Sequence, residues 1–88
     1  MVFFVVTRQG YDELRRLCVE VPTPLWAAKD ALSEGEIESL RAAGANVSIF
    51  SDAMSPDDSD LIEGSLWTIA EHHPGERIWV ERTIKTDR

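Results

Sequence analysis

The sequence predicts a small α/β domain in which four strands alternate with three helices around a mainly parallel four-stranded sheet. Two observations support this prediction. Apolar runs alternate with segments of helical spacing, which is the pattern of crossover units. The first strand, Val2–Val6, is apolar at every position, whereas the later runs 46–50 and 77–81 alternate between apolar and polar residues. Strands covered on both faces are continuously apolar, and strands with one open face alternate.

Because crossovers between parallel strands are right-handed, the strand order determines which face each helix covers. The contrast between the fully apolar first strand and the alternating later strands can therefore be used to choose an order. In the order 2-1-3-4, the first helix covers one face of the sheet and the other two helices cover the opposite face. The first strand is then internal and covered on both faces, while the third and fourth strands each have a face without a helix. We therefore predict a three-layer or open-faced β-α-β-α-β-α-β domain with strand order 2-1-3-4. It resembles a truncated flavodoxin-like arrangement, and an antiparallel last strand also fits the spacing.

Helix start and stop signals place the elements after the first strand. The first helix is predicted over residues 11–21, with Gly10 as its cap and Pro22 and Pro24 ending it. Segment 25–29 follows as an extended strand. The second helix begins at a capping box, in which Ser33 and Glu36 satisfy each other's backbone N–H groups.

The second half of the chain repeats these signals. Gly44 ends the second helix, and strand 45–50 follows. Ser55 is the predicted N-cap of the third helix, with Pro56 at the first helical position. Strand 77–84 and a polar tail, residues 85–88, complete a single domain over residues 1–88.

Composition limits the classes of partner. The net charge is −7 and the basic residues are scattered along the chain, so we expect neither a nucleic-acid partner nor attraction to an anionic membrane. Cys18 is the only cysteine, which excludes an internal disulfide and a multi-cysteine metal site. No apolar run approaches the roughly 20 residues of a membrane span. The apolar run at the N-terminus is about six residues, shorter than the apolar region of a signal peptide, so we expect none. We expect a cytoplasmic protein.

A ligand site is expected where the strand order reverses, beyond the carboxyl ends of the strands. For the order 2-1-3-4 this point lies between the first and third strands. The candidate ligand-binding residues there are Thr7, Arg8, Asp30, Ser51 and Asp52. Arg8 could hold an anion near the first helix, and the two aspartates could share a divalent cation. Alternatively, Arg8 pairs with an acid and the others only end loops.

Several motifs that would define chemistry are missing. The segment after the first strand has a single glycine, so it matches neither a dinucleotide fingerprint nor a P-loop. Receiver domains of similar architecture carry paired acids where this chain has Thr7 and Arg8. Adjacent His72 and His73 point about 100° apart on a helix and do not suit one metal ion. We assign no catalytic residue, metal or cofactor, and an enzymatic activity stays open.

Three aromatic residues are candidates for an interface. Trp67 points away from the apolar stripe of the third helix, among acidic residues, so it either forms a contact surface or folds over the strand edge. Phe50 and Trp79 are expected side by side on the sheet face without a helix. The leading hypothesis is a non-enzymatic protein-interaction module that forms a homodimer by burying this open sheet face, with another protein as the other possible partner. The alternative is a ligand-binding domain, for an anion, Mg²⁺ or small molecule, or a small enzyme.

Overall fold

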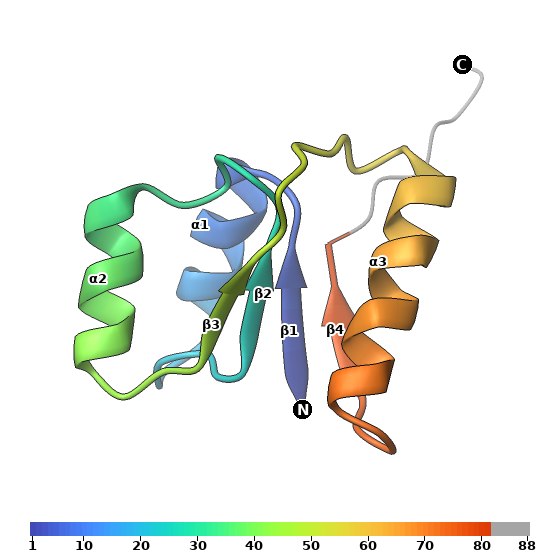
Figure 1. The fold of residues 1–88 in the computed structure, drawn as a ribbon. Helices are drawn as coiled ribbons and strands as arrows, with labels where there is room; N and C mark the ends of the chain where they lie inside the picture. Colours follow the sequence, from blue (N-terminus) through green and yellow to red (C-terminus); the bar gives the residue numbers. More distant parts are fainter. Residues whose placement is uncertain (82–88) are drawn as a thin grey trace.

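The structure is a computed structural model that describes residues 1–81, and it has three layers (Figure 1). The end of the predicted last strand and the predicted tail 85–88 lie outside the described residues. The chain is built from β1 (Val2–Val5), α1 (Arg8–Leu17), β2 (Leu25–Ala27), α2 (Glu34–Ala42), β3 (Val47–Ile49), α3 (Ser59–His72) and β4 (Ile78–Val80). The predicted α/β class with a four-stranded parallel sheet is confirmed.

The sheet is parallel throughout, with strand order β3-β2-β1-β4. β1 is internal and lies beside β2, as the sequence predicts, with Phe4 opposite Trp26. The order differs from the predicted 2-1-3-4 at the other edge of β1. There β4 pairs with β1, with Phe3 opposite Trp79, and β3 pairs with β2 instead.

The physical reason for this order is the burial of β2. Leu25, Trp26 and Ala27 are all buried, so β2 is covered on both faces like β1 and takes the second internal place. The alternating strands β3 and β4 are left at the two edges. Alternation in these strands therefore marks edge positions and not an open face.

Helices cover both faces of the sheet (Figure 1). On one face, α1 and α2 pack over a core of ten buried residues: Val5, Tyr11, Leu14, Leu25, Ala27, Ala31, Leu32, Leu40, Ala45 and Val47. On the other face, α3 packs over a second core: Val2, Phe4, Val6, Trp26, Ala28, Ile62 and Ile69. The two sets alternate along β1 and β2, because successive side chains of a strand point to opposite faces.

The first helix begins earlier than predicted, because Thr7 and not Gly10 is its N-cap. The Thr7 hydroxyl accepts a hydrogen bond from the Gly10 N–H at 3.0 Å. The capping box of α2 is confirmed, with the Ser33 hydroxyl accepting from Glu36 and the Glu36 carboxylate accepting from Ser33. Gly44 has φ of 91°, the left-handed conformation expected at the end of this helix.

The third helix begins after the predicted cap. Asp58 is the N-cap and accepts a hydrogen bond from the Leu61 N–H at 3.2 Å. The predicted cap, Ser55, instead donates its hydroxyl proton to the Asp57 carboxylate. Pro56 consequently lies in the preceding loop. The signal for a helix start was correct, but its position was not.

We predict that the cap at Asp58 determines the stability of this helix start. Asp58→Ala should lower the free energy of unfolding by about 0.5–2 kcal/mol, because it removes the acceptor for an N-terminal N–H. Ser55→Ala, the matched change in the preceding loop, should cost less. Urea denaturation followed by circular dichroism measures both. An equal or larger loss of unfolding free energy for Ser55→Ala would show that Ser55 is the N-cap after all.

Candidate functional site

The carboxyl ends of all four parallel strands lie at the same end of the sheet, at the top of Figure 1. The chain runs from β1 through β2 to β3 and then returns to the opposite side of β1, so the order reverses between β1 and β4. The switch point is therefore bounded by the end of β4, and not by β3 as the sequence-based order implied. The side chain of Glu81, directly after β4, lies at this point.

The Glu81 carboxylate is held by three donors at the start of α1. One oxygen, Oε1, accepts hydrogen bonds from the backbone N–H groups of Val6 at 2.7 Å and Thr7 at 2.8 Å. The other, Oε2, accepts the Thr7 hydroxyl proton at 2.6 Å. We call these three donors the N-terminal cradle. The position is partly buried, and the α1 dipole favours a negative charge there.

Gly10 allows this close approach of carboxylate and helix. A Cβ atom at Gly10 would overlap the Glu81 carboxylate, whose three atoms are its nearest neighbours. Gly10 is itself buried in the first turn of α1. Glu81 is the functional candidate that sequence reasoning missed. Its position at the end of an alternating strand was visible, but the proximity to Thr7 depends on the strand order.

Arg8 does not face an empty site. Its guanidinium pairs with Glu36 of α2 and, at 3.3 Å, with Asp12 one turn along α1. The hydrogen bond with Glu36 is the main cause that raises the pKa of Arg8. Burial on its own would raise the pKa of Glu36, but hydrogen bonds from Ser33 and Arg8 outweigh it and lower that pKa. Arg8 thus joins the starts of α1 and α2.

The other predicted ligand residues do not form a cluster. Asp30, Ser51 and Asp52 are exposed, and their side chains make no hydrogen bond or ion pair within residues 1–81. Asp30 has φ of 69°, a left-handed turn conformation that aspartate tolerates. The loops after β2 and β3 are joined through the backbone, where the Lys29 N–H donates to the Asp52 carbonyl at 3.0 Å. No three or more acidic, histidine or cysteine side chains within residues 1–81 are grouped to hold a metal ion.

The predicted interface pair is not brought together. Phe50 follows β3 and packs in the α3 layer, whereas Trp79 of β4 packs against the core under α1 and α2. The two residues therefore lie on opposite faces and at opposite edges of the sheet. The expectation of a shared open face was wrong, because it required β3 and β4 to be neighbours. Trp67 is exposed, with 71% of its surface accessible.

An apolar groove lies beside Trp67, between α3 and β4. Its volume is about 420 Å³, and it is lined by Glu63, Leu66, Trp67, Ala70, Glu76, Ile78 and Val80. Five of these residues are apolar, and Glu63 and Glu76 add acidic groups. The groove thus places apolar surface directly beside the exposed tryptophan.

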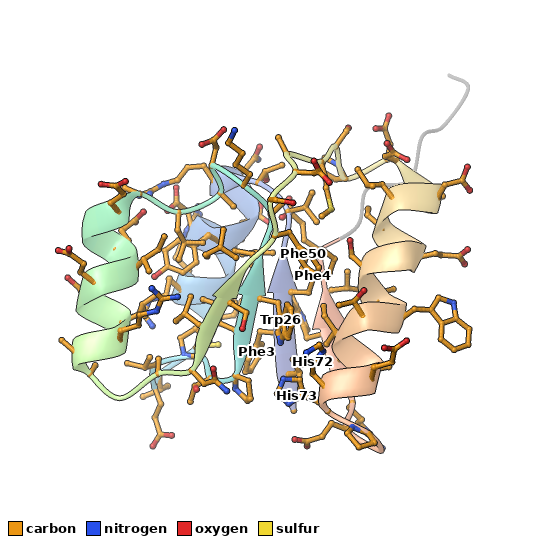
Figure 2. All side chains as sticks on the ribbon, in the orientation of Figure 1. Phe3, Phe4, Trp26, Phe50, His72 and His73 are labelled. Carbon is orange, nitrogen blue, oxygen red and sulfur yellow. The ribbon has the colours of Figure 1, made fainter. Side chains whose placement is uncertain are left out.

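A second feature that sequence reasoning missed is an aromatic cluster between the sheet and α3 (Figure 2). The Trp26 ring lies 5.3 Å from the rings of Phe50 and His72, and Phe50 lies 5.5 Å from Phe4. The Trp26 indole N–H donates to Nε2 of His73 at 3.1 Å. Because an indole N–H is only a donor, Nε2 of His73 is the acceptor of this hydrogen bond. The cluster fixes the C-terminal end of α3 to the sheet.

Comparisons with known proteins add no functional information. No protein-family model, curated protein or solved structure matches the chain. No helix within residues 1–81 is long and apolar enough to cross a membrane.

The shifted pKa of Glu36 predicts an acid-dependent loss of stability. A carboxyl whose pKa is lower in the folded than in the unfolded protein stabilises the fold at pH values above its ordinary pKa, here 4.5. This contribution should disappear as the pH falls from 4.5 through the folded pKa. Glu36→Gln should therefore reduce the slope of stability against pH in that range. Urea denaturation at a series of acidic pH values measures it, with Glu38→Gln as control; identical slopes for Glu36→Gln and wild type would contradict the prediction.

The hydrogen bond between Trp26 and His73 predicts an effect of substitution on hydrogen exchange. His73→Ala removes the acceptor of the Trp26 indole N–H, so this N–H should exchange faster with solvent. His72→Ala, the neighbouring substitution, keeps the acceptor and should leave the exchange much slower than in His73→Ala. Exchange of the indole resonance in ¹H–¹⁵N spectra measures both. Equal exchange in the wild-type protein and His73→Ala would show that the bond is absent in solution.

Proposed function

We propose that the protein is a non-enzymatic interaction module that self-associates through the outer edge of β4 and the adjoining groove of α3. The observation that carries the proposal is the position of Trp67, an exposed tryptophan beside an apolar groove and an edge strand. Aromatic residues are enriched at protein interfaces. This surface replaces the predicted pair of Phe50 and Trp79, which lie on opposite faces.

The edge strand supplies the backbone part of this surface. Within residues 1–81, β4 pairs with β1 and no strand pairs with its outer edge. Glu81 and Arg77 direct backbone groups toward β1, because Glu81 donates to Phe4 and Arg77 accepts from Val2. In a parallel strand, the backbone N–H and C=O groups of successive residues point alternately to the two sides. The backbone groups of Ile78 and Val80 therefore point to the free edge of β4. A free edge of this kind is a template for another strand.

A second copy of the chain fits this edge by symmetry. Two β4 strands related by a two-fold axis pair antiparallel, which extends the sheet and places both α3 helices on the same face. Each Trp67 can then contact the apolar groove of the other copy. A standard interface buries about 800 Å² on each partner, more than a three-residue strand supplies, so the groove and Trp67 have to contribute.

The rival hypothesis is a ligand-binding domain or small enzyme that uses the loops after the strands. It has less support, because Arg8 is paired with two acids, the cradle donors hold Glu81, and Asp30 and Asp52 do not converge. Net charge −7 argues against a nucleic-acid partner. We also propose a cytoplasmic location, in keeping with a chain that has a single cysteine.

The size of the protein in solution tests the proposal. We expect a concentration-dependent dimer in sedimentation equilibrium that Trp67→Glu converts to a monomer without loss of folded structure. Leu17→Glu is the matched control, since Leu17 is also exposed but lies on α1 in the opposite layer. Because each copy carries net charge −7, added salt should strengthen the dimer by screening repulsion.

Two outcomes would contradict this function. A wild-type protein that stays monomeric at every concentration and salt level excludes self-association. A dimer that persists in Trp67→Glu but is lost in Leu17→Glu places the interface on the α1 layer instead.

A further inference from the structure

We propose that Glu81 acts as an internal ligand: its carboxylate occupies the anion position at the start of α1 and closes this position to external anions. This inference is independent of the proposed dimer. It concerns the switch point of the sheet, whereas the proposed dimer concerns the outer edge of β4 and the groove of α3. Three observations support it, namely the topology, the donor set and the absence of a side chain at Gly10.

The topology places the Glu81 carboxylate where an anion is expected. The order β3-β2-β1-β4 is also that of the first four strands in doubly wound dinucleotide-binding sheets, where a pyrophosphate lies at the N-terminus of the helix after β1. Fold alone does not assign such a ligand to this chain. Here the corresponding position contains a carboxylate contributed by the residue after β4, 75 residues away from Val6.

The donor set is that of an anion site built from the backbone. Two N–H groups and one hydroxyl converge on the carboxylate at 2.6 to 2.8 Å, and each oxygen has at least one donor. The ion pairs within residues 1–81 do not include Glu81. The negative charge is therefore compensated by backbone dipoles and by the Thr7 hydroxyl, which do not distinguish a carboxylate of the chain from a free oxyanion.

Gly10 is matched to the internal carboxylate. The three nearest atoms to a Cβ at this position are the carboxylate atoms of Glu81. By contrast, Gly64 in α3 has no atom within 4 Å of an added Cβ. Both glycines are helical, so both would gain helix propensity from alanine, but only Gly10→Ala would displace Glu81. Comparing Gly10→Ala with Gly64→Ala therefore separates the effect of the contact with Glu81 from the effect of helix propensity.

A double-mutant cycle tests the contact. In the wild-type background, Gly10→Ala should lower the melting temperature, because the new methyl group expels the carboxylate. In a Glu81→Ala background the same substitution should leave the melting temperature unchanged or raise it. Gly64→Ala should raise it equally in both backgrounds. An equal loss from Gly10→Ala with and without Glu81 would overturn the proposal.

Added anions test whether the position is closed. Sodium acetate and inorganic phosphate, each compared with sodium chloride at equal ionic strength, should raise the melting temperature of Glu81→Ala through binding to the freed donors. Neither should raise that of the wild-type protein. An equal rise in both proteins would show that the cradle is open, and no rise in Glu81→Ala would show that it does not bind anions.

Hydrogen exchange gives a measurement that does not depend on the stability of Glu81→Ala. The Val6 and Thr7 N–H groups should be protected in the wild-type protein and exchange faster in Gly10→Ala. The Ala28 N–H, which donates to the Val5 carbonyl at 3.0 Å, should keep its protection in both. Unchanged exchange at Val6 and Thr7 would show that Glu81 does not hold these groups in solution, and the proposal would fail.

Discussion

The pairing of β1 on both edges and its burial on both faces is the constraint on which the rest of the domain depends. β1 pairs with β2 and β4, and its side chains contribute to both apolar cores. Val2 and Phe4 face α3, whereas Val5 faces α1 and α2. Because all of these side chains must be removed from water, helices are needed on both sides of the sheet. The three layers follow from this single strand.

The carboxyl end of β1 and its pairing with β4 also determine where polar groups can act. At its carboxyl end the chain turns into α1, and the unpaired N–H groups of this turn need acceptors. The Glu81 carboxylate is such an acceptor. It lies close to these groups because β4 ends beside β1, where the Glu81 backbone N–H donates to the Phe4 carbonyl at 3.0 Å. The cradle is thus a consequence of the β1–β4 pairing. The same pairing leaves the outer edge of β4 beside α3 and Trp67, which is the surface proposed for self-association.

Local signals in the sequence predicted the elements better than their order. The capping box at Ser33 and the left-handed Gly44 require only neighbouring residues, and both are confirmed. Strand order depends on how β2 is buried, and the apolar segment at Leu25 is short enough to resemble a minor edge strand. The cap of α3 shows the same limit: Ser55 and Asp58 both suit a helix start, and the choice depends on the length of the loop after β3.

The candidate sites were predicted unevenly for a related reason. Trp67 was identified because a helical wheel needs only the helix itself, and the structure leaves it exposed. Phe50 and Trp79 were assigned to one surface because their strands were expected to be neighbours, so an error in order became an error in the interface. Glu81 could not be found from spacing, since its donors lie at the other end of the chain. Residues that act through one element can be read from sequence, whereas a site made by two strands requires their order first.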